Sequence, residues 1–260
     1  MKADNEIADY YDNYWNRENA ETWTPAVSPW PEDRFQRVFG HLADLNNVLD
    51  VGCGDGTTYQ PQLQKICRNL SGIDASAGAL KVVAARGIPT TICKIDSAQF
   101  PLESDSFDGA TCIEVFEHLF NPLFAARQIF RVMKPGGVLV TSVPNFGYIG
   151  DRLEALFRGR VRGCPFDPSN PWAGAHIRFF SVRSFKEMLV AAGFQVEEVI
   201  AEGDCSIFDA LWAVAKLNPV CAWLKANVPG PLRLKFLETI FPSLFAPHIV
   251  LVARKAGKTA

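Results

Sequence analysis

Residues Val48–Gly56 read VLDVGCGDG, and this stretch decides the fold of the chain. An apolar run typical of a buried strand ends in glycines at positions 52, 54 and 56. Glycine lets the backbone turn tightly and approach a ligand closely. We expect Thr57 and Thr58 to open a helix whose first N–H groups face the same ligand. The alternative is a strand-to-helix turn that binds nothing.

The spacing of the glycines argues against a dinucleotide site. Such sites have the pattern G-x-G-x-x-G, whereas here the third glycine is Gly56 and position 57 is threonine. Asp50, near the end of the strand, would repel a pyrophosphate but suits a cationic amine. A nucleotide-binding oxidoreductase is therefore disfavoured.

Short β-rich runs alternate with helical patterns over the 260 residues, which predicts an α/β fold with helices on both faces of a parallel sheet. The helical patterns include 121–133, which ends at Lys134-Pro135-Gly136-Gly137, and 181–192, which ends at Gly193. The predicted strands are 46–52, 69–74, 89–96, 107–115, 137–144, 194–202 and 248–254.

Two segments interrupt the alternation, 145–178 and 204–247. The first is rich in Gly, Pro, Arg and aromatic residues, and the second is apolar, helical in pattern and broken by prolines. We interpret both as insertions, which in α/β folds often build the substrate side of a site.

Acidic residues follow two further strands. Asp74 ends the second strand, where a carboxylate can accept both hydroxyls of a ribose. Asp96 and Ser97 end the third, where an acid can bind an exocyclic adenine amine. Single acids at such places are often only helix caps.

With these motifs in order, the chain resembles the class I S-adenosylmethionine-dependent methyltransferases, nearest to the ubiquinone-pathway O-methyltransferase-like group. The motifs are VLDVGCGDG, GIDAS, ID-S, SFDGATCIEVFEHL and MKPGGVLVTSVPN, and they span roughly residues 46–145. The resemblance implies a Rossmann-like sheet of seven strands, the last one antiparallel. It also implies a methyltransferase domain over residues 46–260 and S-adenosylhomocysteine as product.

The resemblance implies a role for each matching position. Gly52 and Gly54 would line the methionine part of the cofactor and Asp50 would lie near its amine. Asp74 would take the ribose hydroxyls, and Glu114 would lie beneath the sulfonium. The full predicted cofactor set is Asp50, Gly52, Cys53, Gly54, Gly56, Asp74, Ala75, Asp96, Ser97, Glu114 and Tyr11.

Residues 1–45 are predicted to form an N-terminal helical lid over the cofactor, as is frequent in this family. Tyr11 lies in its aromatic stretch IADYYDNYW. The alternative is a surface helix anchored by its aromatic residues.

Residues 114–118 read EVFEH and suggest a divalent metal site. If a helical turn begins at Phe116, Glu114, Glu117 and His118 share one face, and His176 is a candidate fourth ligand. Such a set could bind Mg²⁺, Mn²⁺ or Zn²⁺. It resembles the E-x-x-E-H set of the ubiquinone-pathway O-methyltransferases and the small-RNA 3′-terminal 2′-O-methyltransferases.

The alternative for EVFEH contains no metal. Glu114 would then touch the cofactor, Glu117 would cap a helix and His118 would make a supporting hydrogen bond. His118 and Glu117 are our predicted catalytic residues, and if no metal binds, His118 is a candidate general base.

Composition narrows the environment and the partners. The formal net charge of −2 gives no reason to expect nucleic acid, and seven cysteines without a C-x-x-C pair indicate reduced thiols and a cytoplasmic location. We find no signal peptide and no transmembrane run. The apolar segment 204–247 could hold a greasy substrate or touch a membrane surface, or it could pack on the sheet or on a second copy; the oligomeric state stays open.

We therefore expect methyl transfer from S-adenosylmethionine to a small-molecule acceptor, at a hydroxyl oxygen. Lipid-like, polyprenyl and glycan acceptors all fit. The alternatives are a non-catalytic partner protein that binds S-adenosylmethionine and a metal-assisted 2′-O-methyltransferase.

Overall fold

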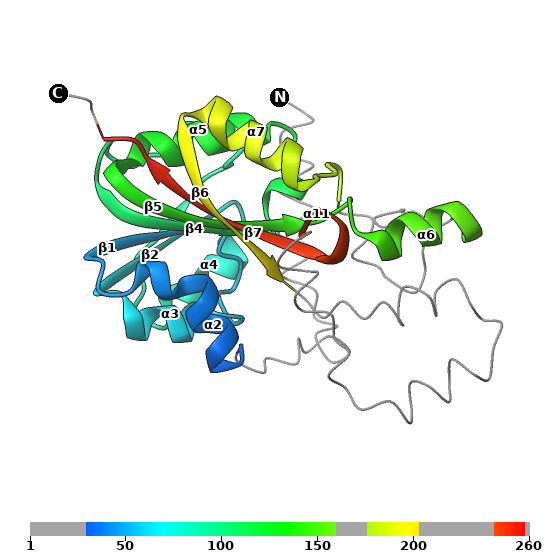
Figure 1. Cartoon of the computed structure of the whole chain (residues 1–260). Coiled ribbons are helices and arrows are strands. Elements are labelled where there is room, and N and C mark those ends of the chain that lie inside the picture. The colour runs from blue at the N-terminus through cyan, green and yellow to red at the C-terminus, as the bar shows by residue number, and fades with distance from the viewer. Residues whose placement is uncertain (1–29, 160–175, 203–241, 258–260) are drawn as a thin grey trace.

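The computed structural model describes residues 30–159, 176–202 and 242–257, and its centre is a single twisted sheet (Figure 1). The sheet has seven strands in the order β3-β2-β1-β4-β5-β7-β6. The strands are β1 (Asn47–Val51), β2 (Asn69–Asp74), β3 (Thr90–Ile92), β4 (Phe107–Ile113), β5 (Met133–Pro144), β6 (Phe194–Glu202) and β7 (His248–Lys255).

The strand directions confirm the predicted fold class. The pairs β3-β2, β2-β1, β1-β4 and β4-β5 are parallel, whereas β7 runs antiparallel to both β5 and β6. The last strand in the sequence is therefore the antiparallel one, inserted between two strands that precede it.

Helices cover both faces of the sheet, with α2, α3 and α4 on one side and α5 and α7 on the other (Figure 1). Along β7, Ile249 and Leu251 pack with the α5 and α7 side, whereas Val250 and Val252 pack with the other side. Each face of the sheet thus has its own apolar core, which explains the continuously hydrophobic strands. The described helices are α2 (Glu32–Phe39), η1 (Gly40–Leu42), α3 (Gln60–Ile66), α4 (Ala77–Ala84), η2 (Phe116–His118), α5 (Pro122–Val132), α6 (Ile149–Arg158), α7 (Val182–Ala192) and α11 (Pro242–Phe245).

The structure corrects the predicted start of the first crossover helix. The helix α3 begins at Gln60, not at Thr57 or Thr58. The Asp55 carboxylate accepts hydrogen bonds from both the backbone N–H and the hydroxyl of Thr57, which closes a local turn before the helix. The loop that carries the glycines is therefore longer than predicted.

Three strand boundaries also differ from the prediction. The third strand ends at Ile92 rather than at residue 96, because the chain turns where the Lys94 carbonyl accepts from Ser97 and Ala98. The fourth strand ends at Ile113, because Glu114 adopts a left-handed φ of 55°. The fifth strand begins already at Met133, before the predicted turn, and its pairing with β4 shifts register between Phe107 and Gly109.

The described part of the predicted lid belongs to the core of the domain. Phe35, Phe39 and Leu42 are buried against the α3 and α4 side of the sheet. The rest of the lid, residues 1–29 with Tyr11, lies outside the described residues.

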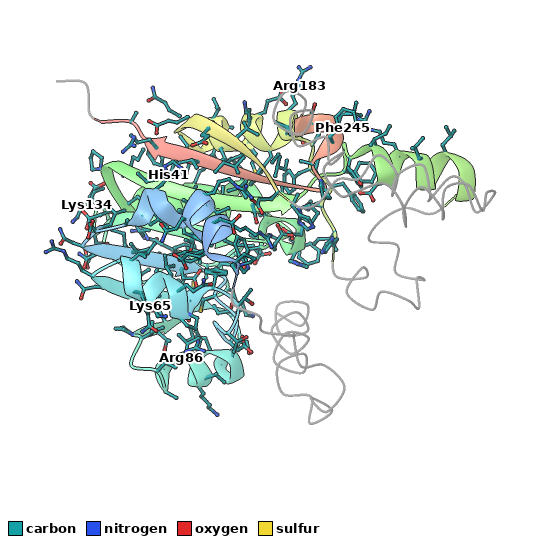
Figure 2. All side chains as sticks on the ribbon, turned by 60° about the horizontal axis from the view of Figure 1, so that its bottom comes forward. His41, Lys65, Arg86, Lys134, Arg183 and Phe245 are labelled. Atoms are coloured by element: carbon teal, nitrogen blue, oxygen red, sulfur yellow. The ribbon has the colours of Figure 1, made fainter. Side chains whose placement is uncertain are left out.

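Of the two predicted insertions, the structure describes the ends. The first contributes α6 and residues 176–178, and the second contributes α11 and residues 246–247. Lys134 marks one end of β5, and Phe245 of α11 lies beside the other end (Figure 2). None of the described helices combines the length and the apolar character that crossing a membrane would require.

Candidate active site

The functional residues gather at the edge where the parallel strands end. Gly52 follows β1, Asp74 ends β2 and Glu114 follows β4. Since β7 is antiparallel, its first residue, His248, lies at the same edge, paired with Pro144 at the end of β5. Ligands of open α/β sheets bind outside this edge.

The glycine loop after β1 requires its glycines. Gly52, Gly54 and Gly56 have φ values of 69°, 51° and 63°, a region that other residues rarely adopt. A Cβ atom at Gly52 would lie 2.5 Å from Cγ2 of Val115. The loop therefore packs directly against the residue that follows Glu114.

Asp50, in the strand before this loop, is hydrogen-bonded to residues that follow the loop and to the neighbouring strand. Its carboxylate has no exposed surface and accepts three hydrogen bonds of 2.7 Å, from the hydroxyl of Tyr59, the amide of Gln60 and the hydroxyl of Thr111. Burial raises the pKa of Asp50 above its usual value, and the three hydrogen bonds act against that rise. The predicted contact of Asp50 with a cofactor amine stays a prediction.

Asp74 links the glycine loop to the next helix. Its two carboxylate oxygens accept the backbone N–H groups of Gly54 and Ser76, each at 2.9 Å. Burial raises the pKa of Asp74, while these backbone hydrogen bonds lower it. The side chain is only partly buried, and the neighbouring Ala75 is also partly exposed. Both residues thus remain accessible at the ligand edge.

Asp96 and Ser97 lie in a turn beyond β3 rather than at the strand end. The Asp96 carboxylate accepts the backbone N–H of Phe120 at 3.0 Å, and Ser97 is exposed. The predicted adenine side of the site is therefore joined to the turn that contains EVFEH. Cys53, also in the predicted cofactor set, is buried in the loop core, and burial raises the pKa of its thiol.

Glu114 is not part of the EVFEH helical turn. The 3-10 turn η2 begins at Phe116, and Glu114 precedes it in a left-handed conformation. Its carboxylate accepts from the Ser142 hydroxyl at 2.7 Å and lies 3.1 Å from Nδ1 of His248. Burial acts to raise the pKa of Glu114, but the hydrogen bonds from His248 and Ser142 outweigh it, so the pKa lies below its usual value.

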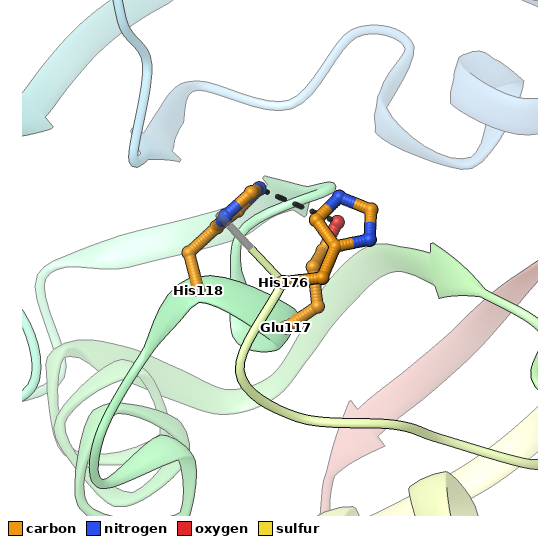
Figure 3. A group of neighbouring side chains, drawn as sticks. All are labelled: Glu117, His118 and His176. Carbon is orange, nitrogen blue, oxygen red and sulfur yellow. Dashed lines mark ion pairs between the residues drawn. The ribbon is translucent and has the colours of Figure 1, made fainter. Parts of the chain in front are cut away.

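Glu117, His118 and His176 form the compact group drawn in Figure 3. Each offers one ligand atom, and the three atoms lie within 4.8 Å of one another. Nε2 of His118 is 3.7 Å from Oε1 of Glu117. The group unites η2 with the end of the first insertion.

Glu117 is the unusual member of this group. Its side chain is 1% exposed, and neither carboxylate oxygen has a hydrogen-bond partner among the described residues. Burial, together with the charge of Glu114, raises the pKa of Glu117 well above its usual value. A buried carboxylate without donors is costly unless a cation or a proton neutralises it.

The backbone near His176 is fastened to the same turn. The N–H groups of Ile177 and Arg178 both donate to the Glu117 carbonyl, at 2.9 and 3.0 Å. The Arg178 guanidinium donates to the carbonyls of Leu119 and Phe120. These contacts bring His176 beside His118, with ring centroids 4.9 Å apart.

Three of the four predicted metal ligands thus meet, and the fourth, Glu114, pairs with a different histidine. Sequence reasoning missed His248, because it stands at the start of the last strand outside every motif. The antiparallel entry of the last strand at the ligand edge was the one available signal.

Comparisons with known proteins identify the family of the chain. Residues 21–199, more than half of the chain, match the model of a methyltransferase domain family. The chain belongs to this family. It is a class I S-adenosylmethionine-dependent methyltransferase by sequence and fold.

Among the relatives of this chain is a probable S-adenosylmethionine-dependent methyltransferase of Mycolicibacterium smegmatis, 29% identical over 192 residues. That match covers 73% of this chain and 62% of the relative, so the chain spans less than two thirds of that protein's length. A ubiquinone biosynthesis O-methyltransferase of Bordetella avium is 28% identical over 138 residues, covering 51% of this chain and 56% of the relative.

Solved structures show the same fold. An S-adenosylmethionine-dependent methyltransferase from Archaeoglobus fulgidus superimposes with a TM-score of 0.56 at 18% identity, over 86% of this chain and 92% of that one.

Proposed function

We propose that the protein transfers the methyl group of S-adenosylmethionine to a hydroxyl oxygen of a small acceptor, with a divalent cation held at Glu117. One observation supports both the hydroxyl acceptor and the bound cation. The Glu117 carboxylate is buried without a hydrogen-bond donor among the described residues, beside His118 and His176. Family membership supports the methyl donor.

The cofactor would lie over the glycine loop. In this proposal Gly52, Gly54 and Gly56 leave room for it, and Cys53 and Ala75 contribute backbone contacts. Asp74, partly exposed and anchored by two backbone N–H groups, accepts the ribose hydroxyls. Asp96 with Ser97 borders the adenine. A bound S-adenosylmethionine supplies a methyl group on a sulfonium, an excellent leaving group, so the protein has mainly to align the reactants.

The residues at Glu117 fit a divalent cation. One carboxylate and two imidazoles are a donor set that suits Zn²⁺ or Mn²⁺ better than Mg²⁺, which prefers oxygen ligands. Such an ion would supply positive charge that lowers the pKa of an acceptor hydroxyl beside it. Glu117, His118 and His176 would hold it, and Arg178 keeps His176 in reach through the hydrogen bonds described above.

Exposed aromatic and aliphatic side chains on and beside the segment that follows His176 favour an acceptor with an apolar part. Ile177, Phe179, Phe146 and Phe120 are all exposed, and the rings of Phe146 and Phe179 lie 5.0 Å apart. The similarity to a ubiquinone biosynthesis O-methyltransferase supports an oxygen acceptor.

The test is a panel of acceptors incubated with the protein, S-adenosylmethionine and either Mn²⁺ or a chelator, with S-adenosylhomocysteine as the measured product. We expect turnover of phenols and catechols that carry hydrocarbon chains, lost with chelator and in Glu117→Gln. Turnover of amines alone would contradict the oxygen acceptor. Binding of S-adenosylmethionine with no turnover of any acceptor class would favour the non-catalytic partner instead.

A further inference from the structure

Three of the four histidines of the chain gather at the ligand edge of the sheet. His118 and His176 belong to the group at Glu117, and His41 pairs with Glu198 away from the site. The third, His248, lies with Nδ1 3.1 Å from Oε2 of Glu114. His248 therefore contacts its own carboxylate, separate from the group formed by Glu117, His118 and His176.

The Glu114 carboxylate is held in place from two sides. The other oxygen, Oε1, accepts the Ser142 hydroxyl at 2.7 Å, and the Glu114 backbone N–H donates to the Ser142 carbonyl at 3.1 Å. Its φ of 55° is costly for a glutamate, and such conformations persist where the surrounding structure imposes them, often at functional sites. Strand β5 thus fixes the direction in which Glu114 meets His248.

This contact selects one form of the imidazole ring. A carboxylate beside Nδ1 keeps the proton on that nitrogen and leaves the lone pair of Nε2 as an acceptor. The His248 side chain is 40% exposed, so the ring is accessible at the edge. Val115, which touches the glycine loop at Gly52, follows Glu114 directly in the chain.

We propose that His248 is the general base of methyl transfer and that Glu114 is its positioning residue, an inference that rests on the hydroxyl acceptor proposed above. The proton of the acceptor hydroxyl passes to Nε2 of His248. The freed oxygen forms a bond to the methyl carbon as the carbon–sulfur bond breaks, and the electron pair stays on sulfur in S-adenosylhomocysteine. Glu114 stabilises the resulting imidazolium, which then returns its proton to solvent.

This assignment moves the base away from His118, where the sequence placed it. His118 lies 3.7 Å from the Glu117 carboxylate, which accepts no hydrogen bond from the described residues, and His118 is needed by that group. Two neighbouring sets thus divide the work, one holding charge beside the acceptor and the other taking its proton.

The experiment compares His248→Ala, Glu114→Gln and the matched control His41→Ala, which also removes a histidine paired with a glutamate. Methyl transfer is measured on phenols of graded acidity, with binding of S-adenosylhomocysteine measured by calorimetry. His248→Ala should lower kcat on weakly acidic phenols by about a hundredfold or more. The loss should shrink on phenols that are already ionised, binding should be unchanged, and His41→Ala should match wild type.

A second readout does not depend on turnover. Nitrogen-15 spectra of the histidine rings should show His248 protonated on Nδ1 in the wild type, and Glu114→Gln should disturb that state. An Nε2-protonated ring in the wild type would overturn the proposal. So would a loss in His248→Ala that is equal for every phenol, or one below about threefold on the weakest acids.

The outcomes also separate this inference from the function beneath it. If the wild type methylates phenols and His248→Ala does so equally well, only the base assignment fails. If the wild type methylates only amines or carbon acceptors, the hydroxyl proposal fails and the base assignment falls with it.

Discussion

Two buried carboxylates at the same edge of the sheet, Asp50 and Glu117, have opposite environments. Asp50 accepts three hydrogen bonds within its own protein, whereas Glu117 accepts none from the described residues. Both are essentially removed from water. The Asp50 carboxylate thus has all its hydrogen bonds within the protein, while the Glu117 carboxylate needs a cation or a proton to neutralise it.

The difference separates a scaffold from a binding site. A carboxylate whose oxygens accept hydrogen bonds from neighbouring residues stabilises the fold and makes its loop rigid before any ligand binds. A carboxylate without donors carries a desolvation cost that a bound cation can relieve. The same chemical group should therefore respond to substitution with opposite signs at the two positions.

The largest effect is expected for Asp50→Ala, which leaves the donors of Tyr59, Gln60 and Thr111 unpaired in the core. Each unpaired buried donor costs about 1–3 kcal/mol, so with three donors the free energy of unfolding should fall by about 3 kcal/mol or more. Urea denaturation measures it. Tyr59→Phe, which removes one donor only, should cost about 1 kcal/mol. A loss below about 1 kcal/mol for Asp50→Ala would contradict the scaffold role.

Gly52→Ala should follow, because it adds both backbone strain and a collision with Val115. The left-handed conformation costs an alanine about 1–2 kcal/mol, and the collision adds to this. Gly87→Ala is the matched control, since Gly87 has a φ of 78° but no atom within 4 Å of an added Cβ. Equal losses of stability in the two variants would show that the packing against Val115 is unimportant. We also expect Gly52→Ala, and not Gly87→Ala, to weaken binding of S-adenosylhomocysteine.

Glu117→Gln should have the opposite sign in protein stripped of metal. Removing a buried carboxylate that accepts no hydrogen bond should raise the free energy of unfolding by about 1 kcal/mol at neutral pH. With saturating Mn²⁺ the order should reverse, because only the wild type gains from binding. Thermal unfolding with and without the ion measures both. If Glu117→Gln is less stable than the wild type in the presence of a chelator, the proposed contrast with Asp50 is wrong.

We expect the smallest effect at Asp108, a partly exposed carboxylate that serves as a reference for the two buried carboxylates Asp50 and Glu117. Burial acts to raise its pKa, but hydrogen bonds from Lys134 and from the backbone of Asn47 outweigh it, so the pKa of Asp108 lies below its usual value. A lowered folded-state pKa adds stability above the unfolded value of about 3.9, and this stability is lost as pH falls through the folded value. Asp108→Asn should thus cost on the order of 0.5 kcal/mol at pH 7. The cost should shrink as the pH falls below the unfolded value and through the lower folded pKa of Asp108, and a cost that does not shrink in acid would contradict the ionic origin.

Much of the fold could be predicted from the sequence because local patterns determine it. Alternating strand and helix patterns, with Gly52 and Gly193 at turns, gave all seven strands in nearly their observed places. The errors lie where side chains override propensity. Asp55 accepts a hydrogen bond from Thr57, so the helix begins later than predicted, and the left-handed conformation of Glu114 ends β4 earlier than predicted.

Only the contiguous part of the candidate site could be proposed from its spacing. EVFEH suggested Glu117 and His118, and His176 was proposed because it closes the first insertion; the three side chains lie together, and their roles stay predictions. The spacing argument for Glu114 failed, because it assumed a regular helical turn that a positive φ interrupts. His248 could not be found from the sequence, since its neighbour Glu114 lies 134 positions away and only the sheet joins them.

The most direct test of the account is a calorimetric titration of the metal-free protein, saturated with S-adenosylhomocysteine, with Mn²⁺ and then with Zn²⁺. We predict one site per chain that is lost in Glu117→Gln and strongly weakened in His118→Ala, while His248→Ala binds as wild type does. The absence of binding by the wild type, or equal binding by Glu117→Gln, would contradict the claim that the buried Glu117 carboxylate binds a cation.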